Sequence, residues 1–161
     1  MEGKERPAAV TNYVTIMRIL GLLYVLGALL FFFFPDWVLW LMNSVPKVIR
    51  LVEIIPASSE HFWVPLATSM MVMLAIIAFS AAASPEIRIL AWVHMASKAC
   101  SSLGYLYIFI FKAHYFAYLV GFLVDLPIFI LVTWLALRAF AAMKKDAATP
   151  EAGPAVAKPE S

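Results

Sequence analysis

Four long apolar stretches constrain this chain more than any other feature of its sequence. They cover residues 13–34, 62–83, 87–111 and 115–140, and a helix of ~20 residues is long enough to cross the ~30 Å hydrocarbon core of a bilayer. The composition agrees, because 64% of the 161 residues are hydrophobic, 14% are charged and the mean hydropathy is +0.90. The sequence therefore predicts an all-α fold, a polytopic transmembrane four-helix bundle formed by residues 13–142.

Charge and residue usage exclude several classes of function. A net charge of +2 provides no basic face for nucleic acid, and a single cysteine cannot form an internal disulfide. The sequence contains no glycine-rich phosphate loop and no nucleophile, base and acid at a suitable spacing, so hydrolytic or ATP-driven chemistry is not indicated. A bis-histidine haem needs a partner for His94 at matched depth, and this chain has none, which leaves open a haem shared with another subunit. No cofactor is predicted.

The polar residues between the apolar stretches define how the helices connect. Ser84 is a good N-cap and Pro85 suits the first turn of the third stretch. The connection at 112–114 is so short that the third and fourth stretches must be antiparallel neighbours. Bulky residues follow the first stretch where a signal peptide needs small ones, so we expect an uncleaved helix.

Three segments lie outside the four predicted spans. Residues 1–12 form a short N-terminal segment, and the alanine- and proline-rich residues 143–161 are expected to be a disordered tail. Residues 37–55 are too polar to cross a membrane but have helical periodicity, which predicts an interfacial helix on the outer surface with Trp37 at headgroup level. Pro46 is expected to bend or divide this helix.

The distribution of basic residues predicts the orientation. Cytoplasmic loops carry an excess of lysine and arginine. In the four-span arrangement the side of the two termini has the larger basic set, which is Lys4, Arg6, Arg18, Arg88, Arg138, Lys144, Lys145 and Lys158, whereas the other side has Lys47, Arg50 and Lys112. We therefore expect a multi-pass protein with both termini in the cytoplasm.

Two charged residues lie near the middle of predicted spans. Lys98 is eleven residues into the third span and Asp125 is ten into the fourth, which puts both roughly 15–17 Å deep. Counted from Ala113 in the hairpin, they are fifteen and twelve residues away in opposite directions, so they should face each other. Leaving either charge alone in lipid costs about 2.5–3.5 kcal/mol, so pairing or shared water is strongly favoured.

Other residues near this pair extend the candidate site. His94, Ser101 and Tyr105 share one helix face with Lys98, and this polar stripe is expected to point inward. Gly104 and Gly121 are at similar distances from the hairpin and are expected to let the two backbones approach closely.

The pair supports three hypotheses. In the first, Lys98 and Asp125 serve only to hold two helices in register; in the second, they belong to a proton or ion relay; in the third, they anchor a polar ligand headgroup. Cys100 is expected to be a small buried apolar residue. Glu60, His61 and His114 are weak candidates for an outer metal site, but no fixed ligand spacing supports them, so no metal is predicted.

The first stretch also carries a family resemblance. Its segment Arg18-Ile19-Leu20-Gly21-Leu22-Leu23, with Gly27 and then Pro35-Asp36, resembles the first helix of small bacterial four-helix membrane proteins of the DoxX-like kind. The resemblance covers the first span and the number of helices, and no functional residue is carried over. Some members are associated with quinone-linked oxidoreductases, so it implies an accessory subunit in a bacterial inner membrane.

Two functions follow as expectations. The first is a non-catalytic accessory or stabilising subunit of a larger membrane complex, with the bilayer and other membrane subunits or further copies of the chain as partners. The alternative is a protein that handles a small molecule, such as a quinone or a lipid headgroup, or a proton or ion, by means of Lys98 and Asp125.

Overall fold

The computed structural model describes residues 6–49, 53–55 and 63–148, and in these residues the fold is all-helical, as predicted. The helices are α1 (Ala8–Phe33), α2 (Pro35–Ile49), α3 (Trp63–Ala83), α4 (Arg88–Phe111) and α5 (Phe116–Ala148). Outside the helices, the described residues contain one isolated bridge between Glu53 and Tyr115.

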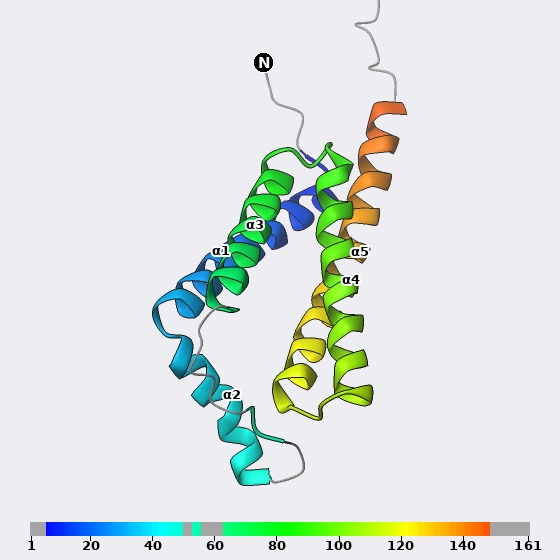
Figure 1. The fold of residues 1–161 in the computed structure, drawn as a ribbon. Coiled ribbons are helices and arrows are strands. Elements are labelled where there is room, and N and C mark those ends of the chain that lie inside the picture. The colour runs from blue at the N-terminus through cyan, green and yellow to red at the C-terminus, as the bar shows by residue number, and fades with distance from the viewer. Residues whose placement is uncertain (1–5, 50–52, 56–62, 149–161) are drawn as a thin grey trace, which may run out of the picture.

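The helices are arranged as two antiparallel pairs (Figure 1). α1 packs along α3, and α4 packs along α5. The pairs converge where α1 begins and α5 ends, and they diverge toward the opposite end, where α2 lies. Burial follows this shape, because the buried residues of α4 stop at Ser102 and those of α5 begin only at Asp125.

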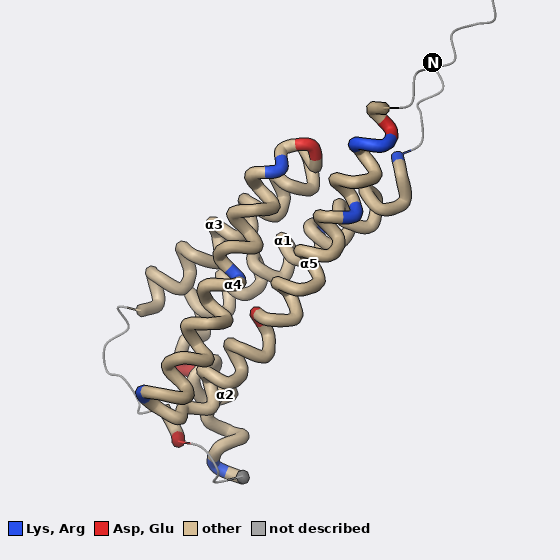
Figure 2. Tube along the Cα trace, turned by 90° about the vertical axis from the view of Figure 1, so that its right-hand side faces the viewer, with Lys and Arg blue, Asp and Glu red and all other residues tan. Residues whose placement is uncertain are grey.

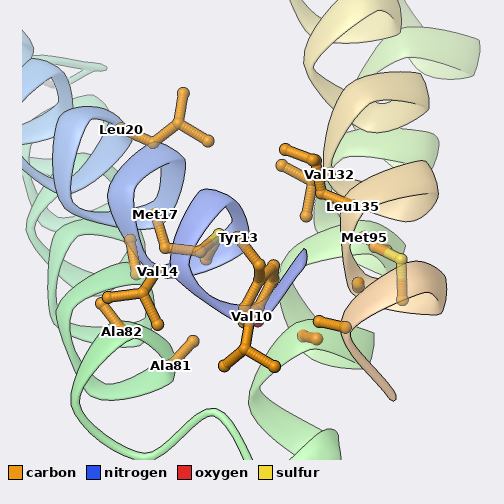
Figure 3. Close-up of a cluster of buried hydrophobic side chains, with 14 of the residues drawn as sticks. Val10, Tyr13, Val14, Met17, Leu20, Ala81, Ala82, Met95, Val132 and Leu135 are labelled. Atoms are coloured by element: carbon orange, nitrogen blue, oxygen red, sulfur yellow. The ribbon is translucent and has the colours of Figure 1, made fainter. Parts of the chain in front are cut away.

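The converged end contains the hydrophobic core (Figure 3). α1 contributes a stripe of buried residues three or four positions apart, including Tyr13 and Met17, which meets alanines of α3 and the inner face of α5. The rings of Tyr13 and Phe140 are 6.3 Å apart between centroids. Small residues permit this close approach: a Cβ atom at Gly21 would lie 2.8 Å from the ring of Phe79 on α3.

Three helices, α1, α3 and α5, are long and apolar enough to cross a membrane. α4 has 24 residues but is not one of the three. It includes Arg88, His94 and Lys98, whose polarity lowers the average hydropathy of the helix. Membrane association therefore rests on three helices, and the four-span topology remains a prediction.

Two helices extend beyond the expected spans. α1 begins at Ala8 rather than at 13, directly after Pro7, whose carbonyl accepts hydrogen bonds from the backbone N–H groups of Val10 and Thr11. α5 continues to Ala148, so residues 143–148 are helical, contrary to the expectation of a tail from 143. Alanine, methionine and lysine are strong helix formers, which explains this extension. Residues 149–161 lie outside the described residues.

α2 differs from the predicted interfacial helix 37–55 in its length. It starts at Pro35, a favoured residue for the first helical position, and it ends at Ile49. Residues 53–55 are not helical. Pro46 lies inside α2 and does not divide it. The proline removes only the hydrogen bond to the carbonyl of Met42, which this short helix tolerates.

Candidate functional site

The centre of the candidate site is the ion pair between α4 and α5. The Nζ atom of Lys98 lies 2.7 Å from Oδ1 of Asp125. Many charged residues lie toward the ends of the helices (Figure 2), and Arg18 and Arg138 lie within α1 and α5 but are exposed, whereas Lys98 and Asp125 are only 4% and 8% exposed. The short connection after Phe111 sets the register of the two helices, so the side chains meet as their matched depths predict.

Ser101 completes the hydrogen bonding of the carboxylate. Its hydroxyl donates to Oδ2 of Asp125, and its Oγ atom is also 3.2 Å from the backbone carbonyl oxygen of Lys98. Both oxygens of Asp125 therefore accept a hydrogen bond. Hydrogen bonds to a charged acceptor are stronger than neutral ones, so this arrangement stabilises an ionised Asp125 among apolar helices.

His94 belongs to a second polar contact, with α1. Its Nε2 atom is 2.9 Å from the hydroxyl of Tyr24, and the histidine is fully buried. The Nζ atom of Lys98 lies 5.0 Å from the centroid of the Tyr24 ring, a cation–π distance. Tyr24 thus contacts both His94 and Lys98 and links α1 to the site.

Sequence reasoning missed Tyr24, although a signal for it exists. It lies on the buried stripe of α1 that also contains Tyr13, Met17 and Leu20. A residue with a hydroxyl group on the inner face of an apolar helix needs a hydrogen-bonding partner. His94, on the inner face of another helix, was an available candidate.

Tyr105 lies one turn beyond Ser101 and packs against α5. Its ring stacks on Tyr118 with centroids 6.3 Å apart, and a Cβ atom at Gly121 would lie 2.6 Å from the Tyr105 ring. Gly121 therefore makes room for an aromatic side chain. The expectation for Gly104 is wrong, because a Cβ atom there would meet nothing within 4 Å. Gly104 does not lie at the contact with α5.

The expectation for Cys100 is also wrong, because its side chain is exposed. Successive residues on an α-helix are rotated by about 100°, so a residue two positions after the buried Lys98 points away from the site. The depth of Cys100 along the helix predicts burial, whereas its direction around the helix axis determines its exposure.

A cavity adjoins the ion pair at the end where the helix pairs diverge. It has a volume of about 310 Å³ and is bounded by residues of all five helices and by Ile55. An overlapping part of about 270 Å³ extends between α3 and α4. Both parts share their main lining residues, which are Phe31, Trp63, Met71, Lys98, Tyr105 and Asp125. The cavity is therefore mostly apolar, with polar groups concentrated at the ion pair.

Of the three weak metal candidates, His114 is the one that the structure describes. Glu60 and His61 lie outside the described residues. The His114 ring packs against Phe109 with centroids 5.6 Å apart, and its backbone carbonyl accepts a hydrogen bond from the N–H of Glu53. Within the part of the chain that the structure describes, no group of three or more His, Cys, Asp or Glu side chains is placed to hold a metal ion.

Comparisons of the chain with protein-family models, with curated proteins and with solved structures find no match. The resemblance to DoxX-like proteins therefore stays a prediction, and the function has to be argued from the site itself.

Proposed function

We propose that this chain is a multi-pass membrane protein that binds a small amphiphilic molecule in the cavity beside Lys98 and Asp125. One observation carries the proposal: a buried, hydrogen-bonded ion pair forms part of the wall of a cavity that is otherwise lined by apolar and aromatic side chains. Sites for small molecules have this composition, with an apolar enclosure and a few polar groups that fix the orientation of the ligand.

The cavity favours ligand binding over a purely structural pair. A pair that only holds two helices in register gains nothing from open space beside it, because unfilled volume loses packing contacts. The volume of about 310 Å³ lies at the lower end of the range of about 300–1,000 Å³ for ligand sites. A small molecule with one polar end matches both the size and the polarity of this space.

The residues around the cavity suggest a role for each group. Phe31, Trp63 and Met71 offer an apolar surface for the body of the molecule. Lys98 has N–H donors for its polar end, while Asp125 holds the ammonium group in place by a hydrogen bond.

The proposed topology has α4 crossing the bilayer together with the three more apolar helices. Its 24 residues correspond to about 36 Å at ~1.5 Å per residue, which is enough to span. Pairing with Asp125 lowers the penalty for Lys98 within the membrane. Both termini are then on one side, together with Arg88, Arg138 and Lys144, which supports a cytoplasmic location by the positive-inside rule.

The test is native mass spectrometry of protein extracted gently from its own membrane. We expect a discrete small-molecule mass on the wild-type chain and its loss from a Lys98→Met/Asp125→Leu variant. Leu103→Ala is the control, because Leu103 is 65% exposed and does not line the cavity. Stoichiometric extra polypeptides on a chain without a bound small molecule would contradict the proposal and favour the accessory-subunit hypothesis.

A further inference from the structure

The charges around the cavity limit what its polar end can bind. Among the described residues that line its two parts, Lys98 and Asp125 are the charged ones, and they neutralise each other. A charged ligand would therefore bring an unbalanced charge into an apolar enclosure, which is strongly unfavourable. An anionic head would also lie close to Asp125, and a cationic head would compete with Lys98.

Lys98 and Asp125 also differ in how many of their hydrogen-bonding positions remain free for a ligand. Both carboxylate oxygens of Asp125 already accept hydrogen bonds, from Lys98 and from Ser101. The Lys98 ammonium has three N–H donors and uses one for Oδ1 of Asp125. Tyr105 lines both parts of the cavity and adds a hydroxyl group. The hydroxyl group can donate or accept, but the ion pair itself has free N–H donors on Lys98 and both carboxylate oxygens engaged, so it suits a ligand whose polar end accepts hydrogen bonds.

The part of the cavity between α3 and α4 opens onto the apolar surface of the protein. Leu66 and Met70 line it, and they are 58% and 43% exposed. On the other side the cavity is covered by Val38, Leu39 and Met42 of α2. A molecule that reaches Lys98 between α3 and α4 passes through lipid-facing side chains, which suits an amphiphile already dissolved in the bilayer.

We infer that the ligand is an uncharged amphiphile whose polar end carries an acceptor oxygen, such as a carbonyl oxygen, that accepts a hydrogen bond from Lys98. This inference rests on the proposed function and specifies the chemistry of the ligand. A lipid ester and a ring ketone share this chemistry, and the experiment separates them.

The experiment uses Trp63, which lines both parts of the cavity, as a fluorescent reporter. The other tryptophans, Trp37, Trp40, Trp92 and Trp134, are all about half-exposed and are replaced by phenylalanine. The full chain in lipid nanodiscs is titrated with decanoylglycerol, decanoate, decyltrimethylammonium and decane, which have chains of the same length and differ in their heads. The compound 2-methyl-1,4-naphthoquinone provides a ring ketone.

We expect a saturable change in Trp63 fluorescence with decanoylglycerol, with the naphthoquinone or with both, and weaker binding of the ionic probes and decane. The Lys98→Met/Asp125→Leu variant should lose at least about tenfold in affinity for the carbonyl probe, because a hydrogen bond from a charged donor is removed. The Leu103→Ala control should bind as the parent does. The carbonyl probe that binds more tightly identifies the lipid ester or the ring ketone as the source.

Tighter binding of decanoate or of the ammonium probe would overturn the inference and leave the proposed function standing, since the cavity would still bind an amphiphile. Equal binding of all probes, decane included, would also overturn it, because the head would not be recognised. If no probe binds, the inference fails. The proposed function fails with it only if native mass spectrometry also finds no small molecule on the extracted chain.

Discussion

The side-chain amide of Asn43 holds both backbone polar groups of Ile55: its Oδ1 atom accepts from the Ile55 N–H at 3.0 Å, and its Nδ2 atom donates to the Ile55 carbonyl at 2.9 Å. This pair of bonds attaches residues 53–55 to α2. The N–H of Glu53 in turn donates to the carbonyl of His114, between α4 and α5. Since Ile55 lines the cavity, the two attachments keep one wall of the cavity in place.

Replacing Asn43 should loosen that wall. Asn43→Ala removes two hydrogen bonds, each with a net contribution of about 0.5–1.5 kcal/mol, so we expect a loss of about 1–3 kcal/mol in unfolding free energy. Hydrogen exchange at residues 53–55 should become faster. Ser44→Ala is the matched control, because the Ser44 hydroxyl donates to the Leu41 carbonyl of its own helix. Unchanged exchange in Asn43→Ala would contradict a role in holding this segment.

The Lys98–Asp125 pair should show strong energetic coupling. Lys98→Met or Asp125→Leu alone leaves a buried charge without its partner, and each should destabilise the fold by about 3–5 kcal/mol. The double variant should recover most of this loss, because it buries no unpaired charge. Unfolding of all four proteins in the same micelles measures the coupling. Additive effects of the two single substitutions would argue against the pair.

The two glycines near the hairpin should respond in opposite ways. Gly121→Ala places a Cβ atom against the Tyr105 ring, so we expect about 1–3 kcal/mol of destabilisation from overpacking. Gly104→Ala meets open space within a helix and should be neutral or stabilising by up to about 1 kcal/mol. Thermal unfolding of the two variants and the parent measures these changes in stability. Adding Tyr105→Leu to Gly121→Ala should recover part of the loss, and no recovery would mean that the Tyr105 ring is not its cause.

Removing the Tyr24 hydroxyl should destabilise the protein without removing the aromatic ring beside Lys98. Tyr24→Phe takes the hydrogen-bond partner from Nε2 of the buried His94, with an expected loss of about 1–3 kcal/mol. Tyr107→Phe is a suitable control, because Tyr107 is half-exposed. Equal stability of the two variants would show that the contact between Tyr24 and His94 contributes nothing measurable.

The helices and the central ion pair follow from local patterns in the sequence. Apolar length indicates the helices, and a short hairpin converts similar sequence distances, fifteen and twelve residues from Ala113, into similar depths, which brings Lys98 to Asp125. Neither step requires knowledge of how the two helix pairs pack together. The same local information is sufficient for Ser101, which shares a helix face with Lys98.

The remaining parts of the site depend on contacts between segments distant in the sequence. Tyr24 and His94 are 70 residues apart, and the sequence does not state which faces of α1 and α4 meet. The divergence of the helix pairs creates the cavity, yet the apolar residues that line it would also fit a lipid-facing surface. The expectations for Cys100 and Gly104 are wrong because the depth of a residue along a helix does not determine its direction around the helix axis.

The converged end of the two helix pairs has a mechanical consequence. Tyr13 and Phe140 meet there in a close-packed core, whereas the cavity lies at the opposite, divergent end. A small rotation about the packed end changes the distance between the helices most where they lie farthest from it. A given change in the angle between the two helix pairs therefore alters the size of the cavity more than it alters the contacts of the core.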